Sequence, residues 1–430
     1  MQAFVAPCRY LSGSIAAPPS KNYTTRYLLA AALAEGESLV VNPAINDDAL
    51  VMRDCLLALG AEIRDAGSGH DLIVRGFGGR PKPKAFLSVG NAGAVLRFLM
   101  AIASLCEEVF FDTPFPDSLG RRPQGDLLRA LDEMGVHTES NEGRLPIVIR
   151  GGRPRGSSVK VGGQVSSQFA SALLFLAPLL PEGLEIAVTG GLRSQAAVRT
   201  TLDVLAQAGI SVRADWDDLI FRVKGNQPYR AGRFMVNGDY PSALAIVAPS
   251  VLLPGQVRLA GLFPDCQGER AALGALQEMG ADITIGSDFV DIKGGAPLHG
   301  IDLNGDPVID AVLSLATAAA FAEGESVFRR VGHLRYKESD RLGDFSREMA
   351  IAGLAMTPME ENLVVRGKPG WIEGGVNVAA HHDHRLVMAL TTAAMHSKRG
   401  LRIDGAEHVS KSYPGFFADL RQLGADIELI

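Results

Sequence analysis

The sequence contains few cysteines and no pattern that would pair them. Four of the 430 residues are cysteines, and they lie far apart, at Cys8, Cys55, Cys106 and Cys266. No C-x-x-C pair occurs, so neither a disulfide framework nor a zinc knuckle is indicated. This usage is typical of a reducing compartment, and we expect the protein to be cytoplasmic.

Membrane-spanning and leader patterns are also missing. The longest apolar runs lie near Ala170–Leu180 and Ala311–Ala322, and both are shorter than the roughly 18 residues that a membrane span needs. The first ten residues have no charged segment followed by an apolar one, so we expect no signal peptide. These features predict a soluble protein that does not bind membranes.

The chain has no excess of positive charge. Lysine and arginine total 42 against 48 aspartates and glutamates, which gives a formal charge of −6 at pH 7. General nucleic-acid binders are usually basic, so that class is disfavoured. Hydrophobic residues make up 47% and charged residues 21%, a balance that excludes wholesale disorder. At roughly 150 residues per domain, the length predicts two or three domains.

One pattern recurs six times along the chain: an amphipathic helix that ends in glycine and is followed by a strand-like segment. The glycines follow one another at steps of 71 to 75 residues. They are Gly60, Gly135, Gly209, Gly280, Gly353 and Gly424. Glycine is favoured just past a helix end, where the backbone needs positive φ. The regular step predicts six copies of one structural unit.

A second helix precedes each copy and is apolar almost all round, which predicts burial on most sides. These segments are 24–36, 93–105, 167–180, 242–255, 310–324 and 384–397. Buried helices need cover from every direction, so three units per domain, with the apolar helices inside, is the economical arrangement. We therefore predict an α/β fold of two domains, with the seam near Arg222–Phe234, where turn-forming and basic residues gather.

Cations lie where the apolar helices are expected to start. Lys21 and Arg26 flank one start and Arg385 sits at another. Arg122, Lys337, Arg341 and Lys411 are expected to open helices of the amphipathic type. Helix N-termini already attract anions and repel cations. Added cations therefore indicate a small ligand with two or more negative charges, held in a cleft.

Two carboxylates and a histidine run accompany these cations. Asp310 starts an apolar helix, and Glu338 lies between Lys337 and Arg341. Carboxylates among cations ionise and can accept protons, but Glu338 can equally be an ion-pair partner of Arg341 at i, i+3. The spacing leaves both interpretations open. In His381–His384 adjacent residues do not face one another on a helix, so a capping or loop role is favoured over a metal site.

Nine motifs together resemble those of the 5-enolpyruvylshikimate-3-phosphate (EPSP) synthases, within the enolpyruvyl transferases. They are PSKNYTTR, GNAGAVLRF, RRPQG, VSSQF, GDYPSA, PVIDA, RYKESDRL, DHRLVMAL and KSYPGFF, in order from residue 19 to 417. The resemblance implies two domains of three βαβαββ-type units, an inside-out α/β barrel arrangement. One domain would be residues 20–235 and the other residues 1–19 with 236–430. The active site would lie in the cleft between them.

The resemblance also implies the activity. The enolpyruvyl group of phosphoenolpyruvate would pass to the 5-hydroxyl of shikimate 3-phosphate, with loss of phosphate from a tetrahedral intermediate. This transferase step belongs to the shikimate pathway, which leads to chorismate and the aromatic amino acids. No metal or organic cofactor is implied. We expect a monomer that acts on small molecules, binds no nucleic acid and is a target of glyphosate.

Site residues follow from the same resemblance. Phosphoenolpyruvate would contact Lys21, Gly93, Arg122, Gln168, Arg341, Arg385 and Lys411. Shikimate 3-phosphate would contact Lys21, Asn22, Arg26, Ser166, Ser167, Gln168, Ser194, Asp310, His333 and Lys337. The proton-transfer candidates are Lys21, Asp310 and Glu338, and the sequence does not assign each step to one of them.

Several positions depart from the family pattern. Asn22, Ala197 and His333 replace a usual serine, tyrosine and asparagine near the acceptor. Ala94 and Phe98 replace a threonine and a proline beside Gly93, which predicts weaker inhibition by glyphosate. Two other functions are compatible with this fold. A UDP-N-acetylglucosamine enolpyruvyl transferase typically has a reactive cysteine before an arginine, and FDTPFPDSLGRRP has none. A non-catalytic phosphate-ligand binder would be expected to lose an acid or a cation that this chain keeps.

Overall fold

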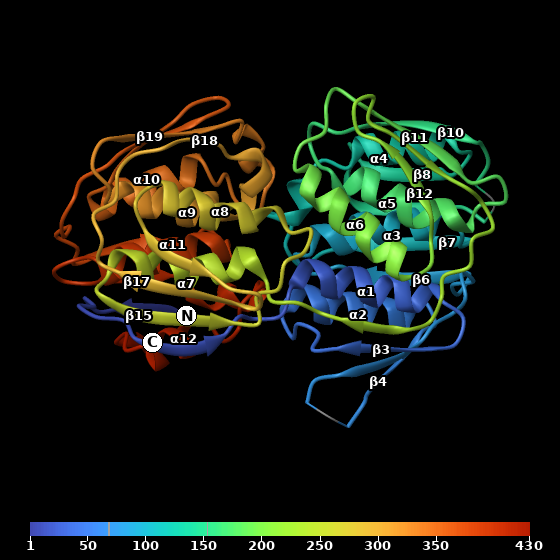
Figure 1. Cartoon of the computed structure of the whole chain (residues 1–430). Coiled ribbons are helices and arrows are strands. Elements are labelled where there is room, and N and C mark those ends of the chain that lie inside the picture. Colours follow the sequence, from blue (N-terminus) through green and yellow to red (C-terminus); the bar gives the residue numbers. More distant parts are fainter. Residues whose placement is uncertain (68, 153) are drawn as a thin grey trace. The chain divides into compact units, whose positions relative to one another are not determined.

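A computed structural model describes residues 1–67, 69–152 and 154–430. The chain forms two compact units (Figure 1). The first unit is Pro19–Val236, and the second unit combines Met1–Pro18 with Asn237–Ile430. The chain thus enters the first unit after a short N-terminal stretch and returns to the second unit for its remaining length.

In the described residues of the first unit, three apolar and three amphipathic helices alternate. They are α1 (Lys21–Leu33), α2 (Asp47–Ala58), α3 (Gly93–Ala103), α4 (Gly125–Glu133), α5 (Gln168–Leu176) and α6 (Gln195–Gln207). Three four-stranded sheets accompany them. Their orders are β14 (Arg233–Met235)–β3 (Glu37–Val41)–β5 (Leu72–Arg75)–β4 (Glu62–Asp65), then β6 (Lys84–Ser88)–β7 (Glu108–Asp112)–β9 (Arg144–Arg150)–β8 (His137–Asn141), and β10 (Ser158–Gly162)–β11 (Leu184–Thr189)–β13 (Ile220–Val223)–β12 (Val212–Asp215).

The second unit repeats this plan. Its helices are α7 (Tyr240–Leu252), α8 (Ala271–Glu278), α9 (Val312–Ala320), α10 (Gly343–Ala352), α11 (His384–Met395) and α12 (Phe416–Gln422). Its sheets are β16 (Asp282–Ile285)–β17 (Phe289–Gly294)–β15 (Gly255–Ala260)–β2 (Gly13–Ala16), then β18 (Asp302–Asn304)–β19 (Glu325–Arg329)–β21 (Leu363–Arg366)–β20 (Ala355–Pro358), and β22 (Val376–Ala379)–β23 (Leu401–Asp404)–β1 (Gln2–Val5)–β24 (Ile427–Leu429).

All six sheets have the same hydrogen-bonding pattern. Each sheet has one parallel pair of strands, at one end of the order, and two antiparallel pairs. The parallel pair is the first one in five of the orders, and in β16–β17–β15–β2 it is the last, β15 with β2. The sheet with β1 keeps this pattern, although β1 comes from the opposite end of the chain from its neighbours β23 and β24. Both N-terminal strands thus complete sheets of the second unit.

The predicted sixfold repeat is confirmed. All six glycines that follow the amphipathic helices have positive φ, between 78° and 109°. The six apolar segments are the helices α1, α3, α5, α7, α9 and α11. Every residue of α3, α7 and α9 is buried. In Figure 1 the helices α7, α9 and α11 lie inside their unit, with strands such as β15 and β19 on its outside. The α/β fold class with buried helices is therefore as the sequence predicted.

Membrane insertion finds no support in the helices. Within residues 1–67, 69–152 and 154–430, no helix combines the length and the apolarity that crossing a bilayer requires.

Candidate functional site

Lys21 is the first residue of α1, directly after the N-cap Ser20, whose hydroxyl accepts from the backbone N–H of Tyr23 at 3.4 Å. The ammonium group of Lys21 lies 3.2 Å from the carboxylate of Asp48, which is buried in the first turn of α2. The ion pair offsets the unfavourable position of a cation at a helix start. The sequence analysis did not predict Asp48 as a site residue. The signal that could have indicated it is the pair of acidic residues, Asp47 and Asp48, at the start of α2.

Arg97 connects the starts of α3 and α5 in the first unit. Its guanidinium donates to the side-chain oxygens of Gln124 at 2.9 Å, of Gln168 at 2.7 Å and of Ser166 at 3.3 Å. It also lies over the ring of Phe169, 5.1 Å from the ring centroid. We call Arg97, Gln124, Ser166 and Gln168 the Arg97 cluster. The sequence predicted Gln168 and Ser166 as site residues but not Arg97, which lies within the quoted GNAGAVLRF motif.

Gly93 opens α3 beside Arg122. A Cβ atom built at Gly93 would lie 2.9 Å from a terminal nitrogen of Arg122 and 3.6 Å from one of Arg97. The missing side chain therefore leaves room for both guanidinium groups at the start of α3. A substrate phosphate or carboxylate at this position would meet two cations and the helix N-terminus together.

Arg26 lies one turn into α1 and is only 1% exposed. It donates to the hydroxyl of Thr201 at 2.9 Å and to the backbone carbonyls of Asn22 at 2.9 Å and Ala197 at 3.2 Å. Burial lowers the pKa of Arg26 to about 10, partly opposed by Tyr23. Its charge is thus held by neutral acceptors of α1 and α6.

The serines predicted to hold the shikimate phosphate occupy helix starts. Ser167 is the buried N-cap residue of α5, and Ser166 accepts from the backbone N–H of Gln168 at 3.2 Å. Ser194 is the N-cap residue of α6 and has a left-handed backbone, with φ of 51°. Left-handed conformations are uncommon for serine and cluster at ligand-binding turns.

Arg341 is the centre of the candidate site in the second unit. Its guanidinium donates to Asp310 at 3.0 Å, to Glu338 at 2.8 Å and to Asp383 at 2.7 and 3.2 Å. Burial alone would lower the pKa of Arg341, but the three carboxylates outweigh burial and raise it well above its ordinary value. We call these four residues, with Lys337 and Lys411, the Arg341 cluster.

Two lysines add positive charge to this cluster. Lys337 lies 3.4 Å from Asp310, and Lys411 lies 3.6 Å from Glu338. Each predicted proton-transfer acid therefore contacts Arg341 and one lysine. The ion pair of Glu338 with Arg341 is real, yet it does not exclude a catalytic role, because the carboxylate also faces Lys411.

Arg385 is the second residue of α11, next to the Arg341 cluster. Asp383 is the N-cap residue of α11 and accepts from the backbone N–H of Arg385 at 2.9 Å. The side chain of Arg385 is buried, and its Nε and one terminal nitrogen have no hydrogen-bond partner among the described residues. Such unsatisfied donors are costly unless a ligand engages them. His333, also buried, lies 3.6 Å from Asp306.

Some expected helix starts were wrong. Arg122 follows the 3-10 turn Leu119–Arg121 with an extended backbone, because the next residue is Pro123, and α4 begins only at Gly125. Lys337 and Arg341 lie between the turn Gly332–Tyr336 and α10. Lys411 ends the turn Ala406–Lys411, before Pro414 and α12. The turns, not the amphipathic helices, present these cations.

The histidine run has a structural role, as expected. Asp383 caps α11, and His381 contacts the buried carboxylate of Glu348 at 2.7 Å. His382 contacts His408 at 3.0 Å. Across residues 1–67, 69–152 and 154–430, no three histidines, cysteines or carboxylates gather as metal ligands would.

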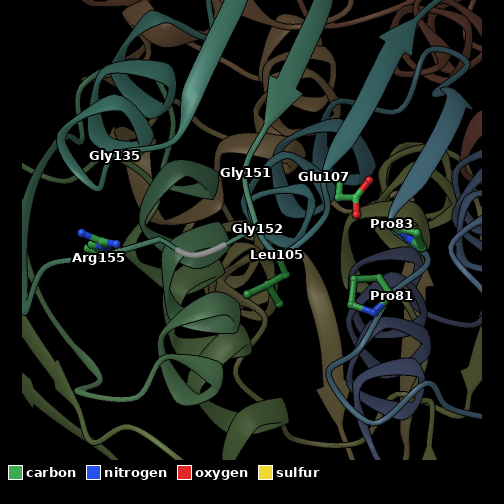
Figure 2. A pocket seen from close by; sticks show the side chains of 8 residues that line it. All are labelled: Pro81, Pro83, Leu105, Glu107, Gly135, Gly151, Gly152 and Arg155. Atoms are coloured by element: carbon green, nitrogen blue, oxygen red, sulfur yellow. The ribbon is translucent and has the colours of Figure 1, made fainter.

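Two pockets lie away from the Arg97 cluster and the Arg341 cluster. One, of about 720 Å³, is lined by residues such as Leu105, Glu107 and Arg155 (Figure 2). The other, of about 770 Å³, is lined by Phe321, Trp371 and neighbouring residues. In the described part of the chain, no predicted site residue lines either pocket.

The fold is that of solved enolpyruvyl transferases. EPSP synthase from Acinetobacter baumannii is 24% identical, with all of both chains covered and a TM-score of 0.82. The enolpyruvyl transferase NikO from Streptomyces tendae is 18% identical, with 99% of this chain and 98% of that chain covered and a TM-score of 0.78. These likenesses place the chain in the enolpyruvyl transferase fold class.

Sequence comparison is more specific. The family model of EPSP synthase (3-phosphoshikimate 1-carboxyvinyltransferase) matches residues 5–420. A 3-phosphoshikimate 1-carboxyvinyltransferase of Deinococcus radiodurans is 48% identical over 425 residues, 99% of this chain and 96% of that protein. One of Methanocaldococcus jannaschii is 36% identical over 422 residues, 97% of each chain. The chain belongs to the EPSP synthase family, which confirms the resemblance seen in its motifs.

Proposed function

We propose that the protein transfers the enolpyruvyl group of phosphoenolpyruvate to the 5-hydroxyl of shikimate 3-phosphate and releases phosphate. Membership of the EPSP synthase family supports this activity. The structural observation that carries it is the Arg341 cluster, in which Asp310 and Glu338 each contact Arg341 and one lysine. Two ionised carboxylates beside cations suit a reaction with proton transfers and anionic substrates.

The chemistry requires a matched pair of proton transfers. In the addition, the 5-hydroxyl oxygen bonds to C2 of phosphoenolpyruvate, a base takes the hydroxyl proton and an acid protonates C3. In the elimination, C3 loses a proton and the C2–O bond to phosphate breaks. Lys21, Asp310 and Glu338 are the candidates for these roles.

Phosphoenolpyruvate would be bound by cations at helix starts and beside short turns. Arg385 supports this role most directly, since its buried guanidinium retains donors without partners among the described residues. Arg122 beside Gly93 offers a second guanidinium at a helix start. The remaining contacts would come from Lys21, Gln168, Arg341 and Lys411. Planar guanidinium groups favour the carboxylate and phosphate of this substrate through paired hydrogen bonds.

Shikimate 3-phosphate would contact the first unit through Ser166, Ser167 and Ser194, and the second unit through Lys337, Asp310 and His333. The residues predicted to bind this substrate thus belong to both units. Lys21, Asn22 and Gln168 complete the acceptor set. Arg26 would reach the shikimate carboxylate only with the two N–H groups it does not give to Thr201, Asn22 and Ala197.

The alternative acceptor, UDP-N-acetylglucosamine, finds no reactive thiol at the expected place. Cys106 lies after α3, is 1% exposed, and burial raises its pKa to about 12. A thiol in this environment is not a nucleophile near neutral pH. The cysteine therefore supports the shikimate acceptor.

The test is phosphate release by the purified full-length protein. We expect release with phosphoenolpyruvate plus shikimate 3-phosphate, and none when either substrate is omitted. UDP-N-acetylglucosamine in place of shikimate 3-phosphate is the matched control. If phosphate is released with UDP-N-acetylglucosamine but not with shikimate 3-phosphate, the protein is a UDP-N-acetylglucosamine enolpyruvyl transferase. Binding of both proposed substrates without turnover would indicate a non-catalytic protein. We expect the active form to be a cytoplasmic monomer.

A further inference from the structure

Glu269 is a buried carboxyl group that the proposed reaction does not use. It lies in the 3-10 turn Gly268–Arg270, between β15 and α8, and is 8% exposed. One of its oxygens accepts from the backbone N–H of Asp310 at 3.4 Å. Glu269 thus touches the main chain of a proton-transfer candidate without competing for its carboxylate.

The turn that carries Glu269 is fixed to the start of α7. Gln267, two residues earlier, accepts from the backbone N–H of Tyr240 at 3.1 Å and donates to the carbonyl of Gly238 at 2.9 Å. From Glu269 the contacts continue through Asp310 to Arg341 and then to Asp383, the cap of α11. One chain of polar contacts therefore links the starts of all three buried helices of this unit.

No cation neutralises Glu269 directly, since it forms no ion pair within the described ranges. Burial raises the pKa of Glu269 to about 7, the negative charge of Asp310 adds to this, and the positive charge of Arg385 opposes it. The charged groups on its own turn and on the elements packed against that turn are Arg270, Asp239 at the start of α7, Asp306 and Asp310 in the turn Asp306–Ala311, and Glu278 at the far end of α8. Arg385 of α11 also acts on Glu269. Burial and the negative charges of Asp310 and Asp239 outweigh the positive charge of Arg385, so the protonated form of Glu269 is favoured.

We propose that Glu269 is a positioning residue for Asp310: its carboxyl group holds the Asp310 backbone, and its protonation state governs how strongly Asp310 attracts a proton. When Glu269 is protonated it is neutral, and Asp310 contacts Arg341 and Lys337 without a second negative charge nearby from Glu269. When Glu269 loses its proton to solvent, a second negative charge faces Asp310 and makes it a stronger base. This inference rests on the proposed function.

The experiment compares Glu269→Gln with wild type in the phosphate-release assay from pH 5.5 to 9. Glutamine keeps the shape and the acceptor oxygen but stays neutral. Near pH 6 we expect kcat of the variant to lie within about twofold of the wild-type value. At pH 8.5 it should be roughly tenfold lower than that of wild type. The KM for phosphoenolpyruvate should change little. Glu269→Asp, which can still ionise, should recover part of the alkaline rate.

Glu278→Gln is the matched control, because Glu278 is exposed on the adjacent helix α8. It should follow the wild-type profile. If wild type turns over but Glu269→Gln differs from it by a constant factor at every pH, Glu269 does not govern Asp310 and the inference fails alone. If wild type shows no turnover with the two substrates, both the proposed function and this inference are wrong.

A second readout does not depend on turnover. The pKa of Glu269 is raised by folding, so the folded state holds a proton that the unfolded state releases, and stability falls as pH rises toward and through about 7. Glutamine cannot lose this proton. We expect the difference in melting temperature, Glu269→Gln minus wild type, to increase by a few degrees from pH 5.5 to pH 8.5. A pH-independent difference would show that Glu269 does not titrate in this range and would overturn the proposal.

Discussion

Asp310 and Glu338 share one guanidinium group. The two terminal nitrogens of Arg341 donate to Asp310 at 3.0 Å and to Glu338 at 2.8 Å. The remaining nitrogen donates to Asp383, which caps α11. The two candidate proton-transfer acids, which lie in different segments of the chain, are thereby held by the same buried cation. Their separation is set by Arg341 and not by the spacing of either segment.

Removing either acidic charge should slow turnover without unfolding the protein. We expect Asp310→Asn and Glu338→Gln each to lower kcat by ~10²–10⁴, because proton transfer is lost while shape is kept. Steady-state phosphate release measures the effect. Asp302→Asn is the control, since Asp302 pairs with Arg329 on an exposed sheet edge of the same unit. If both test variants keep activity within about tenfold of wild type, Glu338 is an ion-pair residue only and the base is unassigned.

Arg341→Met should destabilise the second unit strongly. The change leaves the fully buried carboxylate of Asp383 without its ion-pair partner, which costs about 3–5 kcal/mol. Arg329→Met removes an exposed ion pair and should cost about 0–1 kcal/mol. Urea unfolding monitored by circular dichroism measures both. Equal losses for the two variants would contradict a structural role for the Arg341 cluster.

Phe98 should weaken glyphosate inhibition through its packing. Its ring is fully buried, lies 5.4 Å from that of Phe175, and supports the guanidinium of Arg26 at 5.0 Å. With Ala94 one turn earlier, it fixes the start of α3, where Arg97 and Arg122 gather. Packed interiors relax only partly around added volume, so a longer inhibitor should lose more than the compact substrate.

Phe98→Leu tests this argument better than proline, because proline in the middle of α3 would remove a helical hydrogen bond. We expect glyphosate to bind roughly threefold or more tightly to the variant, with the KM for phosphoenolpyruvate nearly unchanged. Phe86→Leu, at an exposed position of β6, serves as the control. An unaltered ratio of inhibitor to substrate affinity would show that Phe98 does not set tolerance.

His396 should make the second unit sensitive to acid. It ends α11 between the rings of Phe321 and Trp371, at 4.5 and 4.7 Å, and burial lowers its pKa from 6.5 to about 4. The folded state therefore excludes a proton that the unfolded state accepts, so stability falls as pH drops from about 6.5 to 4. Allowing for its partial exposure, the loss is about 1–2 kcal/mol.

His396→Phe keeps the ring packing and removes this titration. Its free energy of unfolding should gain on wild type as the pH falls from 7 to 4.5, as measured by urea titration at each pH. The same change at the exposed His299 should give no such gain. Parallel curves for wild type and His396→Phe would contradict the assignment.

Local signals in the sequence were sufficient for the fold. The glycines from Gly60 to Gly424 mark helix ends because positive φ disfavours other residues, and this signal needs no tertiary information. Apolar residues on every face predicted burial of α3 and α7 in the same way. The family motifs then fixed the class of enzyme.

The contacts within the site were less predictable. Arg97 meets Gln124 and Gln168, and Lys21 meets Asp48, across distances in the chain that no periodicity encodes. Glu269 carries no motif of its own, and its importance appears only when the turn before α8 is packed against Asp310. Long-range pairs of this kind depend on how the repeats assemble, which the local pattern does not contain.

The two ends of the chain meet in one sheet. Gln2 and Ile430 exchange both backbone hydrogen bonds, at 2.9 and 2.8 Å, and β1 lies between β23 and β24. During synthesis β1 must therefore wait until β23 and β24 have left the ribosome, while the first unit can already fold. A circular permutant that joins Ile430 to Met1 through a short linker and opens between Pro18 and Pro19 would make the second unit contiguous and remove this delay.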